Sequence, residues 1–171
     1  RVIAAEVGGA FGGKNASYID AAAALLARKA GRPVRITMTR AEVFLGTGPS
    51  SGTVIRVKAG AKRNGQLTAL DAQLYYEAGA YPGSPMGSGV NVLVGAYVIP
   101  NGHIEGYDIV VNKPRVGSYR GPGGTPANFA MEQIMDELAL KLGMDPLAFR
   151  LQNSVRNGSQ DLLGHTLSDI G

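Results

Sequence analysis

Residues 53–77 read TVIRVKAGAKRNGQLTALDAQLYYE, and this stretch predicts the centre of the fold. Apolar and polar residues alternate on both sides of Asn64-Gly65, a dipeptide that favours the tight turn of a β-hairpin. The alternating apolar positions are Ile55, Val57 and Ala59, followed by Leu70, Ala72, Leu74 and Tyr76. Because a period of two places such residues on one face, we expect two paired strands, 53–61 and 67–77.

The clearest helical pattern follows the hairpin, at 126–142. Its apolar residues share one helix face, at Met131, Ile134, Met135, Leu138 and Leu142. Gly143 ends this helix, and Asp145-Pro146 supplies the N-cap and first residue of a short helix that reaches Leu151. A further strand is expected over 104–111.

The first part of the chain indicates a strand, a helix and a second strand. Residues 1–7 and 34–38 are expected to be strands, and the alanine-rich segment 16–30 a helix that packs closely against other elements. This order resembles a βαβ unit. Residues 79–89 are rich in Gly, Pro and Ser and predict a long loop. The chain 1–171 is therefore expected to form a single α+β domain, with mixed sheet elements, a βαβ-like start, a β-hairpin and C-terminal helices.

Two glycine-rich turns stand out, GGAFGGK at 8–14 and YRGPGGTP at 119–126. Glycine lets the backbone approach a ligand closely because it has no Cβ. Each turn is expected to precede a helix, whose N-terminal N–H groups suit an anion. The two turns therefore predict two walls of one site for a large anionic cofactor, with the loops close together in space.

Composition excludes several classes of protein. The 171 residues include 25 glycines, no cysteine and a net charge of +4, with the basic residues scattered. We therefore expect no nucleic-acid partner, no thiolate nucleophile and no cysteine-held cluster in this chain. The absence of cysteine is compatible with a cytoplasmic location. No apolar run is long enough to cross a membrane. The chain lacks an initiator methionine, and we expect it to be a fragment of a larger protein.

The first turn also fits the P-loop pattern G-x-x-x-x-G-K, so a nucleotide-binding module is one alternative. Asn15 stands where that motif needs Ser or Thr, and Phe11 is bulky for a loop that wraps phosphates. A structural or interaction domain without a site is a second alternative. The histidines, His103 and His165, have no metal-ligand spacing, and the carboxylates form no sequence-local pair, so neither a metal ligand nor a catalytic residue is predicted.

Six segments together resemble the molybdenum-binding large subunit of the xanthine dehydrogenase/aldehyde oxidase family. They span nearly the whole chain in the same order: EVGGAFGGK at 6–14, TRAEVF at 39–44, GAY at 79–81, YVIPN at 97–101, YRGPGG at 119–124 and MDPLAFRLQN at 144–153. The resemblance implies that the chain is a fragment of the molybdopterin-binding region of a larger subunit.

The resemblance also implies a function. Such enzymes insert a water-derived oxygen at a carbon, using a molybdenum-molybdopterin cofactor that is often the cytosine dinucleotide. Electrons leave through 2Fe-2S and FAD subunits or domains of the same complex, which is expected to be dimeric. The residues matched to the cofactor are Gly9, Ala10, Phe11, Gly12, Arg120 and Gly121. In the family, the base that assists the reaction is a glutamate in a Gly-Glu-Gly-like segment. That segment is absent here, so this chain alone is expected to be inactive.

The substrate side of the resemblance indicates an aldehyde or an N-heterocycle rather than a purine. Where the xanthine-oxidising branch has a glutamate after the first loop's lysine, this chain has Asn15. Pro122 replaces a phenylalanine of the second loop, and Ser50 falls near a position that carries arginine. Asn15 and Pro122 are therefore expected in the pocket of a small-molecule substrate.

Overall fold

A mixed three-stranded sheet forms one side of the main body of the molecule. The computed structural model describes residue 3 and residues 5–169. Within them, β1 (Thr53–Ala61) pairs antiparallel with β2 (Leu67–Gly79), and β2 pairs parallel with β3 (Gly102–Val110). The predicted hairpin is confirmed, with Thr53 opposite Tyr76, and so is the α+β class.

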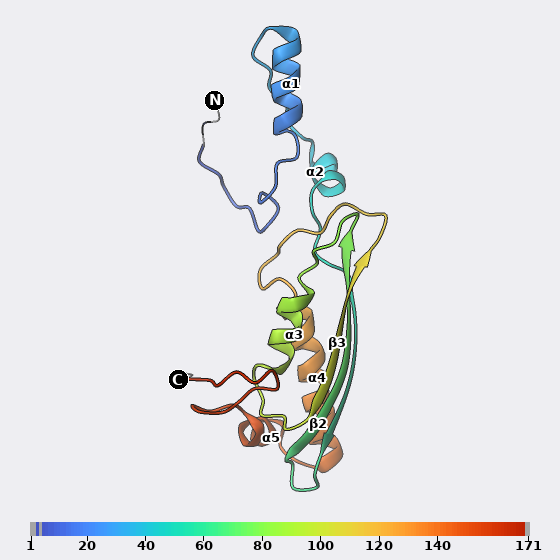
Figure 1. Cartoon of the computed structure of the whole chain (residues 1–171), viewed down its shortest axis with the longest axis vertical. Helices are drawn as coiled ribbons and strands as arrows, with labels where there is room; N and C mark the ends of the chain where they lie inside the picture. The colour runs from blue at the N-terminus through green and yellow to red at the C-terminus, as the bar shows by residue number, and fades with distance from the viewer. Residues whose placement is uncertain (1–2, 4, 170–171) are drawn as a thin grey trace.

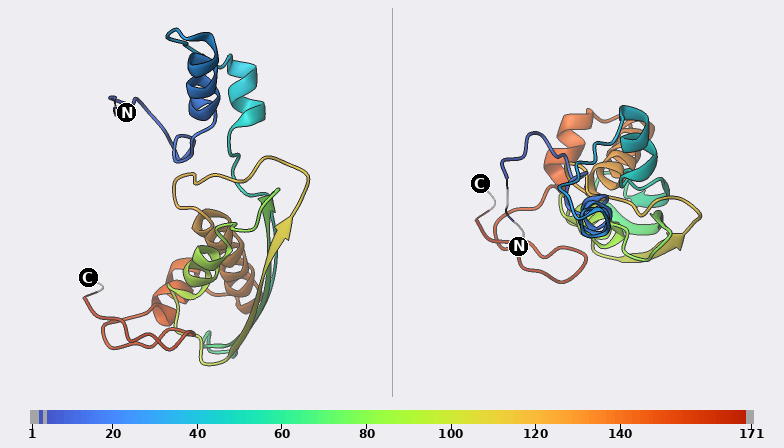
Figure 2. Two further views of the ribbon diagram at one scale, coloured as in Figure 1. Left: turned by 45° about the horizontal axis from the view of Figure 1, so that its top comes forward. Right: turned by 90° about the horizontal axis from the view of Figure 1, so that it is seen from above.

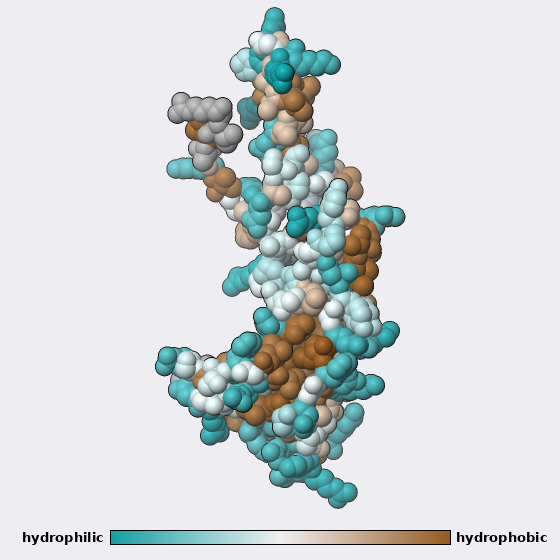
Figure 3. Space-filling view, viewed as in Figure 1, coloured by the Kyte–Doolittle hydropathy of each residue, from teal (hydrophilic) through white to brown (hydrophobic). Residues whose placement is uncertain are grey.

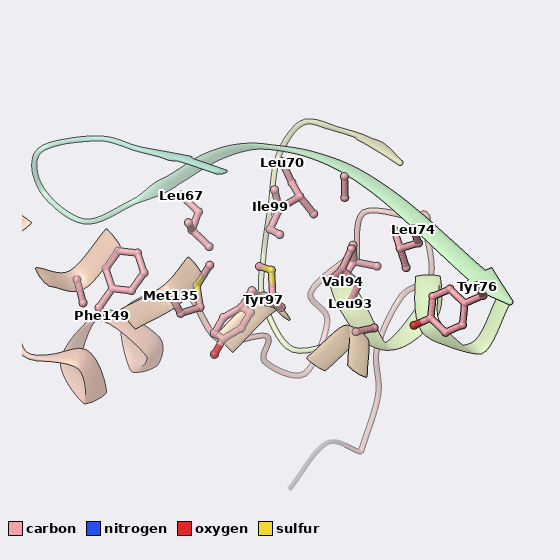
Figure 4. Packing of buried hydrophobic residues seen from close by; sticks show 14 residues of the cluster. Leu67, Leu70, Leu74, Tyr76, Leu93, Val94, Tyr97, Ile99, Met135 and Phe149 are labelled. Carbon is pink, nitrogen blue, oxygen red and sulfur yellow. The ribbon is translucent and has the colours of Figure 1, made fainter. Parts of the chain in front are cut away.

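Three helices cover one face of this sheet: α3 (Met86–Val94), α4 (Gly124–Leu142) and α5 (Pro146–Asn153) (Figure 1). The core lies between them and β2, and Figure 4 shows its apolar side chains pointing toward one another. The largest fully buried side chains include Leu74, Tyr76, Leu93, Met131, Met135 and Phe149. Both helices predicted after residue 125 are confirmed.

Polar contacts join the C-terminal helices to the rest of the body. The Arg150 guanidinium donates to Glu132 and contacts Asp136, each at 2.7 Å. The Tyr97 hydroxyl donates to the other oxygen of the Glu132 carboxylate at 2.7 Å. Burial of Tyr97 and its contact with Glu132 raise the pKa of its phenol to about 12, so this hydroxyl stays a proton donor. The network orients α5 against α4.

An N-terminal arm carrying α1 (Asp20–Ala30) and α2 (Arg40–Gly46) extends from the body (Figures 1 and 2). Here the sequence-based expectations were partly wrong. Helix α1 begins at Asp20 rather than 16, and none of its residues is buried, so it does not pack closely against another described element. No strand forms over 34–38 or over the described part of 1–7; residues 1, 2 and 4 lie outside the described residues. A strand needs a neighbour to receive its hydrogen bonds, and no described strand pairs with these segments.

Two further helices were missed from the sequence. The expected loop 79–89 ends early, because α3 begins at Met86 and includes Gly87 and Gly89. Helix α2 begins with a capping box, in which Thr39 and Glu42 each accept the other's backbone N–H. Of the helices in the described part of the chain, none has the length and apolar character needed to cross a bilayer.

Candidate functional site

The two glycine-rich loops meet through their backbones. Gly12 has φ +84°, and a Cβ built there would overlap the Ser118 carbonyl. Ser118 directly precedes the second loop, so the first loop rests on the segment that leads into it. A side chain at Gly12 would push the loops apart, because the atoms it would meet belong to rigid backbone. The predicted approach of the two loops is therefore seen in the structure.

A first cavity of about 520 Å³ opens where the loops meet. Its walls include Gly12, Asn15 and Pro122, together with Tyr18 and Arg115. Asn15 and Pro122, expected from the sequence to share a substrate pocket, thus lie on one cavity.

A second cavity of about 820 Å³ adjoins the first. Three residues line both cavities: Pro85, Gly117 and Pro122. Arg120 and Gly121 lie only on the second. The apolar rings of Tyr119 and Phe129 form part of its wall, and so does Ser50. The first loop reaches only the first cavity, through Gly12, whereas the second loop lines both.

Three of the expected cofactor residues, Gly9, Ala10 and Phe11, line neither of these two cavities. The Phe11 side chain is 75% exposed, and its ring lies beside Gly9, where a Cβ would come within 2.7 Å of it. The Gly13 N–H donates to the Ala10 carbonyl at 2.8 Å and closes the turn. In this structure these residues shape the loop, while Gly12 reaches the cavity wall.

A hydrogen bond from the sheet holds the second loop in place. The Tyr76 hydroxyl, fully buried on β2, donates to the Gly123 carbonyl at 2.7 Å. Burial raises the pKa of this phenol to about 12, so it remains a neutral donor at physiological pH. Gly123 has φ +74°, and a Cβ there would overlap the Pro85 carbonyl at the start of α3. The loop backbone is therefore fixed between β2 and α3.

We expect the substitution Tyr76→Phe to loosen this loop while keeping the core filled. The Gly123 carbonyl would lose its buried donor, which costs about 1–2 kcal/mol. Hydrogen exchange of the assembled enzyme should then show faster exchange at Gly124 and Thr125. Tyr81→Phe is the matched control, since Tyr81 is 67% exposed and should leave these amides unchanged. Equal exchange in the two variants would show that the Tyr76 hydroxyl does not hold the loop.

The wall facing the second loop is anchored by β3. The Asp108 carboxylate accepts the backbone N–H groups of Gly83 at 2.7 Å and Ser84 at 3.0 Å. Gly83 and Pro85 both line the first cavity. These two hydrogen bonds tie the segment that leads into α3 to the sheet.

The two cavities suit an anionic ligand. Arg115 and Arg120 contribute cations, and the described residues that line the cavities include no Asp or Glu. An anion would therefore meet no repulsive charge on these walls, and no carboxylate base is present on them. Sequence reasoning missed Arg115; a basic residue five positions before Arg120, in the segment that leads into the glycine loop, was the available signal.

The fold and these cavities define a cofactor-binding domain, and comparison with known proteins gives its family. The family model described as "Molybdopterin cofactor-binding domain" matches residues 1–154, and the chain belongs to this family. The resemblance to the molybdenum-binding subunits of xanthine dehydrogenases and aldehyde oxidases is thereby confirmed.

Three similar proteins show the extent of the match. A probable xanthine dehydrogenase subunit of Bacillus subtilis (strain 168) is 38% identical over 90% of this chain and 21% of its own length. The nicotinate dehydrogenase large molybdopterin subunit of Eubacterium barkeri is 31% identical over 99% and 40%. The solved aldehyde oxidoreductase of Desulfovibrio gigas has a TM-score of 0.82 and 33% identity, over 91% of this chain and 18% of that one. The chain thus spans between about a fifth and two fifths of these proteins.

The P-loop alternative is not favoured. In that motif the lysine stands at the start of the helix that follows the loop. Here α1 begins at Asp20, and residues 15–19 between Lys14 and the helix are bends and irregular backbone. Lys14 therefore does not lie at a helix N-terminus. The alternative of a domain without a site is not favoured either, because the glycine loops line two cavities.

Proposed function

We propose that this chain forms part of the molybdenum-binding subunit of a hydroxylase that oxidises an aldehyde or an N-heterocycle with water-derived oxygen. Because the chain belongs to this family, one observation in particular supports the proposal. Two adjoining cavities lie along the glycine loops, the first lined by residues of both loops and the second by the second loop; they carry two arginines and have no carboxylate among their described lining residues. Such walls suit a pterin cofactor with anionic dithiolene and phosphate groups.

Each residue of the site has a part in this proposal. The bare backbone at Gly12 and Gly121 would allow close approach of molybdopterin, in its cytosine dinucleotide form, and Arg120 would balance its negative charge. Gly9, Ala10 and Phe11, which precede Gly12 in the first loop, would hold it in its left-handed conformation. When bound, the cofactor supplies oxygen transfer to the substrate carbon and accepts its electrons. The rings of Tyr119 and Phe129 would exclude water from that side.

We propose that the substrate occupies the first cavity and is not a purine. Asn15 presents a neutral amide there, and Pro122 offers no ring to stack on a purine. Ser50, on the second cavity, carries no charge. The names of the relatives support both classes in the proposal, since one is an aldehyde oxidoreductase and one a nicotinate dehydrogenase. One relative is named a probable xanthine dehydrogenase, and an assay with purine substrates decides for or against that chemistry.

The exposed surface supports the proposal that the chain is a fragment of a larger subunit. Its accessible surface is 11532 Å², whereas a compact 17.8 kDa protein exposes about 8,000 Å². Apolar side chains on the arm are open, with Leu25 at 65% and Phe44 at 75% exposure. Figure 3 shows a further apolar patch in the region of α3, where Val92 is exposed. We propose that the rest of the subunit covers these surfaces, in a cytoplasmic and dimeric complex with 2Fe-2S and FAD partners.

The test is to purify the whole complex and measure its molybdenum, its pterin and its turnover. We expect about one molybdenum per subunit and oxidation of aldehydes or N-heterocycles with oxygen derived from labelled water. Xanthine and hypoxanthine should turn over at least ~100-fold more slowly, since a lost charge contact and a lost stacking ring each cost about 1–3 kcal/mol. Absence of molybdenum would defeat the proposed function, and efficient purine turnover would defeat only the substrate class.

The 171 residues alone should not catalyse the reaction. Hydroxylation needs a base within about 3 Å of the reacting hydroxyl, or reached through one water. The described lining residues offer no carboxylate, and the chain has no cysteine to hold a cluster. The check is to add molybdenum cofactor and an artificial electron acceptor to the purified chain. Repeated turnover above a cofactor-only control would place the base within this chain.

A further inference from the structure

We propose that Arg115 binds a carboxylate of the substrate, so that the enzyme acts on anionic aldehydes or N-heterocycles. This inference rests on the proposed function, and it assigns a ligand class to the first cavity. Its basis is a guanidinium on the cavity wall with no partner among the described residues, held on a rigid backbone beside neutral hydrogen-bond donors.

Arg115 is exposed, and it differs in its contacts from a neighbouring cation. Lys113, two residues earlier, forms an ion pair with Glu77 at 2.8 Å. Arg115 has no hydrogen bond or ion pair with any described residue. The Asp108 carboxylate instead accepts the Gly83 and Ser84 N–H groups on the same side of the cavity. The guanidinium is therefore available for an anion that enters from outside.

The backbone that carries Arg115 is tightly fixed. Gly79 has φ +80°, and a Cβ there would overlap the Pro114 carbonyl and lie 2.7 Å from the Arg115 Cα. The Val116 N–H donates to the Ala78 carbonyl at 3.0 Å, and the Gly117 N–H to Pro49 at 2.8 Å. The Nη2 of the side chain lies 3.3 Å from the place of a Cβ at Gly83, another residue that lines the cavity. The backbone therefore fixes the point from which the exposed Arg115 side chain reaches the cavity.

Neutral donors complete the cavity. The Tyr18 hydroxyl accepts the Gly48 N–H at 3.0 Å, which leaves its own hydrogen free to donate. Asn15 adds an amide to the same wall. These groups and the fork of Arg115 match the two oxygens of a carboxylate. The volume of about 520 Å³ is in the range that takes a one- or two-ring molecule.

The competing ligand is a phosphate of the cofactor, which shares this oxyanion chemistry. The position of Arg120 favours the substrate carboxylate. Arg120 and Gly121, two of the proposed cofactor residues, lie on the second cavity, whereas Arg115 lies on the first with the proposed substrate residue Asn15 and with Gly12. The experiment has separate readouts for the two ligands.

The test compares matched substrates in the assembled enzyme. Two pairs of substrates are used: carboxybenzaldehyde with benzaldehyde, and a pyridine carboxylate with its carboxamide. Arg115→Gln should lower kcat/KM for the carboxylates about 10- to 100-fold and for the uncharged partners less than about threefold. Arg115→Lys should retain part of the preference, because it keeps the charge but loses the fork. Arg63→Gln, in the hairpin turn and away from both cavities, is the control and should change neither pair.

Two measurements besides turnover complete the test. Molybdenum and pterin content should stay unchanged in Arg115→Gln, and calorimetry should show benzoate binding weakened about 10-fold or more. Loss of cofactor in the variant would assign Arg115 to the cofactor phosphate and overturn the proposal. An equal loss for both members of each pair, or benzoate binding unchanged, would overturn it as well. Wild-type enzyme that oxidises aldehydes without preferring carboxylates would defeat this inference alone, whereas absence of molybdenum would defeat the proposed function.

Discussion

Gly12→Ala should lower the molybdenum content of the assembled enzyme by more than about 10-fold. Alanine at φ +84° is strained by roughly 1–2 kcal/mol, and its Cβ would overlap the Ser118 carbonyl. Because that neighbour is backbone, relief requires the first loop to move away from 117–122, which widens the first cavity. Metal analysis of the purified complex, together with its absorption spectrum, measures the loss.

Gly8→Ala supplies the control within the same loop. A Cβ at Gly8 meets no atom within 4 Å, and its φ is not in the left-handed region. This variant should keep its molybdenum and its turnover within about twofold of the unaltered enzyme. If both variants bind cofactor equally well, contact between the loops does not build the site, and the assignment of Gly12 to the cavity wall has no functional meaning.

The main body could be predicted because its elements carry their own signals. The hairpin has alternation on both strands and Asn64-Gly65 between them, and β1 and β2 pair in the register that this turn imposes. Helix α5 has both its N-cap, Asp145, and Pro146 at its first position. Local propensity and tertiary packing agree at these positions, so a short window of sequence was sufficient.

Elements that depend on distant partners could not be predicted. Helix α3 carries Gly87 and Gly89, which normally indicate a loop. At Gly89 the glycine has a tertiary reason, since a Cβ would come within 2.5 Å of the Tyr76 hydroxyl on β2. The prediction for the arm was wrong for the opposite reason. The apolar pattern at 16–38 indicates burial, but the described chain provides no element that covers it. Burial against a surface outside the chain leaves the same sequence pattern as burial within it.

The site, like the fold, could be predicted from the sequence only in part. Glycine spacing predicted that the loops converge, and Gly12, Asn15 and Pro122 line one cavity. Glycine spacing could not tell which of four successive loop residues reaches the wall, because that depends on the conformation of Phe11, at φ 50°. Arg115 was missed because its availability depends on which carboxylates pair with other groups, and those pairs join segments far apart in the sequence.

Asn153→Ala should be the most destabilising polar substitution in the body, at about 2–5 kcal/mol. Asn153 is 5% exposed and ties α5 to the hairpin turn. Its Oδ1 accepts the Leu67 N–H at 2.9 Å, and its Nδ2 donates to the Gly65 and Phe149 carbonyls at 2.9 and 2.8 Å. Alanine would leave these three backbone groups without their side-chain partner at a buried position.

Hydrogen exchange of the assembled enzyme locates this loss without requiring global unfolding. In Asn153→Ala the amides of Leu67 and of α5 should lose protection by about 30-fold or more, since every 1.4 kcal/mol is tenfold. Gln152→Ala is the matched control: its amide donates to the Asn64 carbonyl at 3.0 Å in an exposed position, so its removal should cost about 0.5–1 kcal/mol. Similar exchange in the two variants would mean that water replaces the lost partner of the Leu67 amide, and that packing around Phe149, rather than the Asn153 amide, holds α5 to the hairpin.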